Sequence, residues 1–181
     1  MIELQHFSNE DYDQLIGWIP TAAFLMKWGG PIFQFPLDHN QLDSYTTRPD
    51  RIVYKAWDSK AKEVVGHISL GRIDNKNESA RIGKVLVSPE HQNRGIGEQM
   101  IAQVTAIAFE DLKLHKVALG VFDFNQPAIR CYEKAGFQKD GLLRDHRKVN
   151  GSFWNLLEMS LLRTEWDPYF SHNQKREASS Y

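Results

Sequence analysis

The chain opens with alternating apolar and polar residues and then changes to a helical spacing. Residues 2–7 (IELQHF) alternate in the manner of a half-buried strand. Ser8 follows, and the acidic first turn and apolar spacing of NEDYDQLIGWI predict a helix capped by Ser8 or Asn9. The chain is therefore predicted to begin with a strand followed by a helix.

Three further runs with strand periodicity follow. Residues 51–58 (RIVYKAWD), 63–73 (EVVGHISLGRI) and 80–88 (ARIGKVLVS) are separated by the polar, turn-forming stretches SKAK and DNKNES. Short turns between consecutive strands favour antiparallel pairing, since a parallel pair needs a long crossover connection. We expect these runs to form a meander of three antiparallel strands.

The second half of the chain alternates helices and strands. A helix is predicted over roughly residues 95–112, a strand over 116–122 and a second helix over 125–137. Two strands follow, joined at Asn150-Gly151, because Asn-Gly is a strong hairpin signal.

No internal repeat or linker interrupts this pattern. We expect one α+β domain over residues 1–166 and a polar tail over residues 167–181, which is predicted to fray.

The region of residues 20–49 has the weakest pattern. It is irregular and contains two adjacent glycines, four prolines and several aromatic residues. A long aromatic stretch of weak periodicity is often a lid or a substrate-binding loop. The alternative is a set of short helices packed on the core, and the sequence leaves both interpretations open.

Composition and charge narrow the classes of protein. The chain has 181 residues and a formal net charge of -1, which argues against a dedicated nucleic-acid binder. Cys131 is the single cysteine, so no internal disulfide can form, which fits a reducing compartment. The N-terminus has neither the positive region nor the apolar core of a secretory signal, and no stretch approaches a membrane span. We expect a soluble, cytoplasmic protein without a membrane partner.

A pair of glycines at the mouth of a helix is the strongest chemical signal. Arg94, Gly95 and Gly97 precede the apolar periodicity, where the first helical amides have no internal partner and the helix dipole favours an anion. Without a Cβ, the glycines let a large anion approach the backbone, so the stretch predicts a phosphate cradle. Neither the P-loop nor the Rossmann spacing fits, because no Lys-Ser/Thr follows Gly97 and Met100 replaces the third Rossmann glycine. A helix that merely begins with glycines is the alternative.

The spacing that fits is Q-x-x-G-x-G at Gln92 to Gly97, and with its surroundings it resembles a known family. The run VLVSPEHQNRGIGEQMI resembles the acetyl-CoA pyrophosphate motif of the GNAT superfamily of N-acetyltransferases, and NQPAIRCYEKAGF resembles that superfamily's next motif. The ending GLLRDHRKVNGSFWNLLEMSLLRTEW is similar to the subgroup of ribosomal-protein N-terminal and polyamine acetyltransferases. The resemblance covers about residues 52–166. It implies a single domain with a mixed, largely antiparallel sheet flanked by helices, in which a splayed strand pair binds acetyl-CoA.

The resemblance also implies roles for particular residues. The backbone of the splayed strand would pair with the pantetheine arm, and an amide near Val85 would stabilise the oxyanion of a tetrahedral intermediate. The following loop would hold the pyrophosphate, and the start of the second helix would contact the cofactor's arm. The implied cofactor-binding residues are Val85, Leu86, Val87, Gln92, Asn93, Arg94, Gly95, Ile96, Gly97, Glu98, Asn125 and Ala128.

Tyr132 is the implied catalytic acid. Its phenol would protonate the departing CoA thiolate, and a phenol has a pKa high enough to stay protonated at neutral pH. The alternative is that Ile129 and Tyr132 simply share an apolar helix face. The neighbouring Cys131 is expected to serve packing rather than a covalent route.

The general base is where this sequence departs from the family pattern. Many relatives carry a Glu at the position that Arg81 occupies here, which puts a simple carboxylate base in doubt. One alternative is a base that acts through a water molecule, and the candidates are Glu78, Asp123, Glu158, His67 and His146. The other alternative is loss of the amine's proton to bulk solvent. None of the seven histidines forms an H-E-x-x-H cluster, so no metal is expected.

The acceptor and the class of activity stay open at the level of the sequence. The resemblance implies direct acetyl transfer to a primary amine, which is a small molecule or a protein N-terminus. A non-catalytic acyl-CoA sensor on the same fold is the alternative, while a nucleotide-binding module would need a doubly wound pattern that these strands lack. The sequence gives no indication of oligomeric state.

Overall fold

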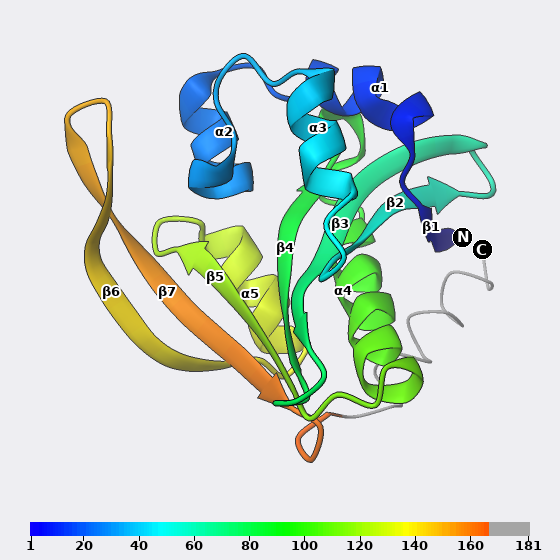
Figure 1. Cartoon of the computed structure of the whole chain (residues 1–181), viewed down its shortest axis with the longest axis vertical. Helices are drawn as coiled ribbons and strands as arrows, with labels where there is room; N and C mark the ends of the chain where they lie inside the picture. The colour runs from blue at the N-terminus through cyan, green and yellow to red at the C-terminus, as the bar shows by residue number, and fades with distance from the viewer. Residues whose placement is uncertain (167–181) are drawn as a thin grey trace.

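A twisted sheet forms the centre of the structure, a computed structural model that describes residues 1–166 (Figure 1). Within that range the sheet has seven strands in the order β1-β2-β3-β4-β5-β7-β6. The strands are β1 (Ile2–His6), β2 (Ile52–Asp58), β3 (Glu63–Asp74), β4 (Ser79–Val87), β5 (Lys116–Phe122), β6 (Gln138–Val149) and β7 (Ser152–Leu162). The predicted α+β class is confirmed. The predicted tail, residues 167–181, lies outside the described residues.

The first half of the sheet is the predicted antiparallel meander. β1 pairs with β2, β2 with β3 and β3 with β4, all antiparallel, and β1 joins the three strands expected from the sequence. The alternating pattern that predicted these strands places every second side chain on the same face. Ala56, Ile68, Leu70 and Ile82 are consequently buried.

The pairing between β4 and β5 is short and interrupts the hydrogen bonding across the sheet. It is the one parallel pairing among the described strands, and it joins only Ser79, Ala80 and Arg81 to the start of β5. Beyond Arg81 the two strands diverge, and Figure 1 shows the widening gap between their ends. The splayed strand pair implied by the family resemblance is therefore present.

Two helices cover one face of the sheet with an apolar core. They are α4 (Ile96–Ala106) and α5 (Gln126–Lys134), and they bury Met100, Ile101, Val104 and Ile129 against the strands. The helix predicted over residues 95–112 ends earlier as an α-helix, because a π-helical turn over Ile107–Asp111 follows α4. Lys134 of α5 donates to Glu98 of α4 at 2.6 Å, which ties the two helices together at the surface.

Short helices cover one end of the opposite face. Residues 20–49 form α2 (Ala22–Gly29), a 3₁₀ turn at Gly30–Ile32 and α3 (His39–Thr46). Before them lie a 3₁₀ turn at Asn9–Asp11 and the helix α1 (Tyr12–Gly17), and a further 3₁₀ turn at Pro89–His91 follows β4. The loop interpretation of residues 20–49 is thus wrong, and the alternative of short helices on a core holds. A second apolar cluster lies beneath them and includes Leu25, Trp28, Leu42 and Tyr45.

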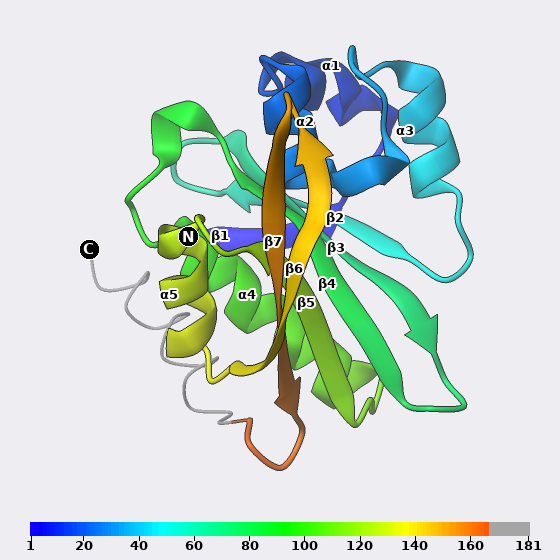
Figure 2. The same cartoon turned by 90° about the vertical axis from the view of Figure 1, so that its left-hand side faces the viewer.

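The C-terminal hairpin has the predicted turn. Asn150 and Gly151 both have positive φ, at 49° and 83°, and Val149 pairs with Ser152 across them. Such backbone angles are those of the tight turn that Asn-Gly favours. Both views show the tip of the β6–β7 hairpin near α2 (Figures 1 and 2). Among residues 1–166, no helix is both long enough and apolar enough to cross a membrane.

Candidate active site

The predicted phosphate cradle lies at the N-terminus of α4, directly after the end of β4. Gly95 has a φ of 70°, a left-handed conformation that favours glycine, and a Cβ built on it would meet nothing within 4 Å. Among the described residues no side chain caps α4, which leaves the amides of its first turn to an external acceptor. Gln92, Asn93 and Arg94 are exposed around this turn. The local geometry therefore suits an anion.

Gly97 is the point at which three predicted parts of the site meet. A Cβ built on Gly97 would lie 3.8 Å from Sγ of Cys131 on α5 and 3.9 Å from Cγ2 of Val87 on β4. The cradle, the splayed strand and the helix that carries Tyr132 are thus brought together. In the chain these parts extend from Val87 to Tyr132. This convergence is not visible in the sequence without the fold.

The end of β4 has unpaired backbone groups on its inner edge, the edge that faces β5. Val87 and Leu86 pair with Gly66 and His67 of β3 on one side, whereas on the β5 side the pairing has ended at Arg81. A bulge centres on Lys84, whose φ is 55°. Strand edges with unpaired amides and carbonyls can accept an extended ligand as an added strand.

His67 fixes this bulge instead of serving as a base. It is fully buried, and its Nδ1 lies 2.8 Å from the carbonyl oxygen of Lys84, to which a neutral imidazole donates. Burial lowers the pKa of His67 to about 4, so the ring is neutral at physiological pH. The hydrogen bond holds the bulge where β4 leaves β5, which is a structural role.

Tyr132 lies on the buried face of α5. It is 7% exposed and packs against Phe137, with ring centroids 6.1 Å apart. Burial raises the pKa of the phenol further above its ordinary value, so the hydroxyl keeps its proton at neutral pH. Asn125 caps the same helix without a side-chain capping bond, and Ala128 is partly buried against the core. The predicted acid is therefore a protonated, largely buried donor.

Cys131, next to Tyr132, is half-buried. Burial and the nearby Glu98 raise the pKa of its thiol to about 12, so it is not a thiolate at neutral pH. These surroundings fit packing better than nucleophilic catalysis.

Arg81 forms an ion pair that sequence reasoning missed. Its Nη1 and Nη2 donate to the two carboxylate oxygens of Glu158 on β7, at 2.8 and 3.0 Å. The pair crosses β5 at Gly120, where a Cβ would come within 3.2 Å of Nη2 and 3.3 Å of Oε1. A glycine at this position leaves room for the pair. Since the partners are 77 residues apart, no local signal could have indicated the contact.

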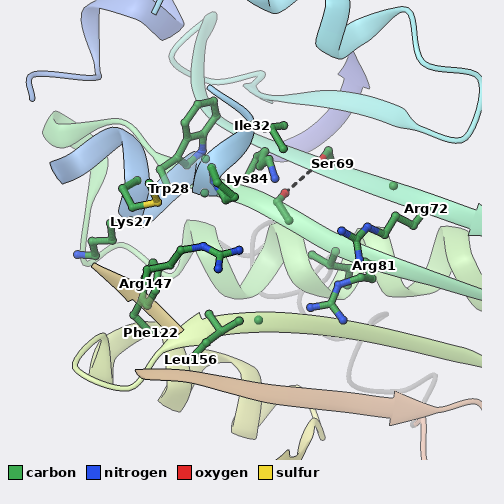
Figure 3. A pocket seen from close by; sticks show the side chains of 18 of the residues that line it. Lys27, Trp28, Ile32, Ser69, Arg72, Arg81, Lys84, Phe122, Arg147 and Leu156 are labelled. Carbon is green, nitrogen blue, oxygen red and sulfur yellow. Dashed lines mark hydrogen bonds between the residues drawn. The ribbon is translucent and has the colours of Figure 1, made fainter. Parts of the chain in front are cut away.

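A cavity of about 430 Å³ opens between β4, β5, β7 and α2 (Figure 3). Of the candidate bases, Glu158 and His146 line it, whereas Glu78, Asp123 and His67 do not. Residues 26–32, in and after α2, form one of its walls. The region that sequence reasoning associated with substrate choice thus contributes directly to the cavity.

The fold and the site define a class of protein before any comparison: an α+β domain with splayed central strands and an anion cradle after the first of them. Residues 9–137 match the model of the Acetyltransferase (GNAT) family, and the chain belongs to that family. The family that the sequence motifs suggested is therefore confirmed.

Individual relatives cover only part of this match. The chain is 30% identical over 105 residues to a spermidine N(1)-acetyltransferase of Vibrio cholerae, which is 58% of this chain and 60% of the relative. It is 34% identical over 102 residues to a putative ribosomal N-acetyltransferase, YdaF, of Bacillus subtilis, covering 56% and 55%. The matched part thus spans about three fifths or less of the length of these curated relatives.

A solved structure supports the fold over a longer stretch. The spermidine N-acetyltransferase of Vibrio cholerae, in complex with CoA and spermine, superposes with a TM-score of 0.79 at 22% identity. The superposition covers 91% of this chain and 96% of that one. At this level of identity the likeness establishes the architecture.

Proposed function

We propose that the protein is an acetyl-CoA-dependent N-acetyltransferase that transfers the acetyl group directly to a primary amine. The observation that carries the proposal is the meeting at Gly97 of the uncapped N-terminus of α4, the unpaired edge of β4 and the helix of Tyr132. Membership of the GNAT family supports the same activity.

Acetyl-CoA would be held mainly by backbone groups. The turn from Gln92 to Glu98 would hold the pyrophosphate, because its glycines and free amides suit an anion. The inner edge of β4, at Val85, Leu86 and Val87, would pair with the pantetheine arm, and Asn125 and Ala128 would contact it from α5. Burial of the strand's side chains and binding by its backbone are compatible, since side chains project from the faces of the sheet and backbone N–H and C=O groups point along its plane.

The transfer would proceed without a covalent enzyme intermediate. The amine nitrogen attacks the acetyl carbonyl carbon, and an amide near Val85 stabilises the oxyanion that forms. The carbon–sulfur bond then breaks, and Tyr132 donates its proton to the thiolate. The amine's own proton leaves to water, or through water to His146 or Glu158, which line the cavity.

The acceptor is a primary amine, either a small molecule or a protein N-terminus. The relatives include proteins named for spermidine and for ribosomal acetylation, so the names alone do not choose between these classes.

The test is acetyl transfer to a panel of amines, followed by release of free CoA thiol. The panel contains spermidine, an aminoglycoside, amino acids and a short peptide with a free N-terminus. We expect thiol release that depends on the amine, with the acetylated product detected by mass spectrometry. A protein that binds acetyl-CoA but releases no thiol with any amine would instead be a sensor.

A further inference from the structure

The cavity is strongly basic although the whole chain carries a net charge of only -1. Among residues 1–166, six basic side chains line it against one carboxylate, that of Glu158. The six are Lys27, Arg51, Arg72, Arg81, Lys84 and Arg147. They come from five different elements or turns, and Figure 3 shows Arg72, Arg81, Lys84 and Arg147 around the same space.

Only part of this charge is neutralised. Glu158 is taken by Arg81, and Arg51 lies over the ring of Tyr45 with its guanidinium carbon 4.6 Å from the centroid. The ring contact leaves the charge of Arg51 uncancelled. Within residues 1–166, neither Arg51 nor the other four basic side chains form an ion pair with a carboxylate; the four are Lys27, Arg72, Lys84 and Arg147. The cavity therefore has a surplus of positive charge that a ligand can balance.

The neighbouring positive charges also act on Lys84 itself. Burial is the main cause that lowers its pKa to about 8, and the charges of Arg51, Arg72 and Arg81 lower it further. A second cation entering the cavity would meet the same repulsion, whereas an anion would relieve it.

Acetyl-CoA does not explain the surplus. None of the residues that line the cavity belongs to the cradle of residues 92–98 or to α5. The basic lining of β4 ends at Lys84, before the segment that would pair with the pantetheine arm. The basic lining therefore lies outside the proposed acetyl-CoA site, and its charge is left for another ligand to balance.

We infer that the amine acceptor carries an anionic group, a carboxylate or a phosphate, which Lys84 and Arg147 hold inside the cavity while Arg72 and Lys27 attract it at the rim. Lys84 and Arg147 are half-buried and Arg72 and Lys27 are exposed, which fits these two positions. The inference rests on the proposed acetyl transfer and narrows its substrate class. A polyamine, which carries only positive charge, is disfavoured by the same lining.

The experiment compares amines that differ mainly in charge. One set is 4-aminobutyrate, butylamine and 1,4-diaminobutane; another is glucosamine 6-phosphate and glucosamine. We expect kcat/KM to be at least about tenfold higher for an anionic member than for its neutral or cationic counterparts, since a charge-assisted hydrogen bond is worth about that factor or more. The two sets distinguish a carboxylate from a phosphate. Equal values, or a preference for the diamine, would overturn the inference.

Matched variants locate the effect. Arg147→Gln should remove most of the preference for the anionic amine, and Arg147→Glu should improve the diamine relative to the wild type. Arg144→Gln is the control, because Arg144 lies on the same strand but does not line the cavity. Melting temperatures of all variants show that they are folded. A preference that survives in Arg147→Gln would contradict the assignment of this residue.

A binding measurement separates the inference from the proposed activity. Titration with inorganic phosphate and with acetate, followed by isothermal titration calorimetry, needs no acetyl transfer. A signal that saturates in the wild type and in Arg144→Gln, and weakens about tenfold in Arg147→Gln, supports the anionic site even where no amine is acetylated. A wild-type protein that neither prefers anionic amines nor binds these anions overturns the inference, whatever its activity with acetyl-CoA.

Discussion

At the scale of single residues, Tyr132 allows catalysis and packing to be measured apart. Tyr132→Phe keeps the ring that packs on Phe137 and removes the hydroxyl. If the hydroxyl protonates the leaving thiolate, kcat and kcat/KM should both fall by about 100-fold or more, because general acid catalysis is typically worth that much. Steady-state thiol release with one accepted amine measures the change.

A second buried tyrosine supplies the control. Tyr54 is similarly buried, but it lies on β2 and stacks on His6. Tyr54→Phe should leave turnover unchanged, and both variants should lose little stability. Near wild-type turnover of Tyr132→Phe, where chemistry limits the rate, would exclude Tyr132 as the acid.

Lys84 makes the stability of the protein depend on pH. Its pKa is about 8 in the folded protein against 10.5 unperturbed, so the unfolded chain binds more protons between these values. Stability from this residue is therefore lowest below pH 8 and rises as the pH increases towards 10.5. Lys84→Met removes this dependence, so the variant should be more stable than the wild type at pH 7. The difference in free energy of unfolding should be about 1 kcal/mol smaller at pH 10, a figure that allows for screening by solvent because Lys84 is partly exposed.

Urea unfolding at several pH values measures this difference. Lys76→Met, in the exposed turn between β3 and β4, is the matched control and should track the wild type. A difference between Lys84→Met and the wild type that does not change with pH would mean that Lys84 is solvated as an ordinary surface lysine.

At the scale of elements, the contact of β3 with α4 depends on a missing side chain. A Cβ on Gly66 would lie 2.8 Å from the carbonyl oxygen of Leu86 and 2.8 Å from Sδ of Met100. Gly66→Ala should therefore destabilise the fold by about 1–3 kcal/mol, as overpacking of a core does.

The matched control is Gly83→Ala on β4, where the nearest atom, Oγ of Ser69, would be 3.9 Å from the new Cβ. Its free energy of unfolding in urea should change far less than that of Gly66→Ala. Equal effects of the two substitutions would show that backbone entropy matters here and the close approach does not.

Most of the sheet and α4 could be predicted from the sequence. β4 and α4 were recognisable because they bury alternate and helically spaced side chains. β2 and β3 were recognisable from β-branched and aromatic residues between polar turns, although β3 is buried on both faces from Val65 to Gly71. α2 and α3 were not, because each has only eight residues and lies in a stretch interrupted by glycine and proline. Their N-caps, Thr21 and Asp38, were nevertheless readable signals, since each accepts from an amide three residues later.

The candidate site also has a part that could be predicted from the sequence and a part that could not. The cradle at Gln92–Gly97 is a continuous segment whose chemistry depends on local backbone geometry, so its spacing could be recognised directly. The pairing of Arg81 with Glu158 and the basic cavity depend on side chains from distant strands. A net charge near zero hides such a cluster, because acidic residues elsewhere on the surface balance the total.

At the scale of the whole molecule, binding of acetyl-CoA should stabilise the fold. A ligand that binds only the folded state, at 100 times its dissociation constant, adds about 2.7 kcal/mol to the free energy of unfolding. For a chain of this size we expect a rise in melting temperature of about 5–10 °C. No shift at millimolar acetyl-CoA would count against the proposed function.

Gly97→Asp should abolish this shift without lowering the melting temperature of the free protein. The new Cβ makes only ordinary contacts, and a carboxylate in the first turn of α4 is favourable for the helix dipole. The same carboxylate repels a pyrophosphate. Gly97→Ala, which adds the Cβ without the charge, should reduce the shift less than Gly97→Asp does, so the difference between the two variants measures the effect of the charge.

The short pairing of β4 with β5 also has a mechanical consequence. Only three residue pairs join the two strands, so the sheet consists of two half-sheets, β1–β4 and β5–β7, connected at one end. A small rotation about that end, as about a hinge, bends few ladder hydrogen bonds. The bidentate contact between Arg81 and Glu158 spans this hinge and restrains its angle. The same two residues thus shape the cavity and limit how far its walls can separate.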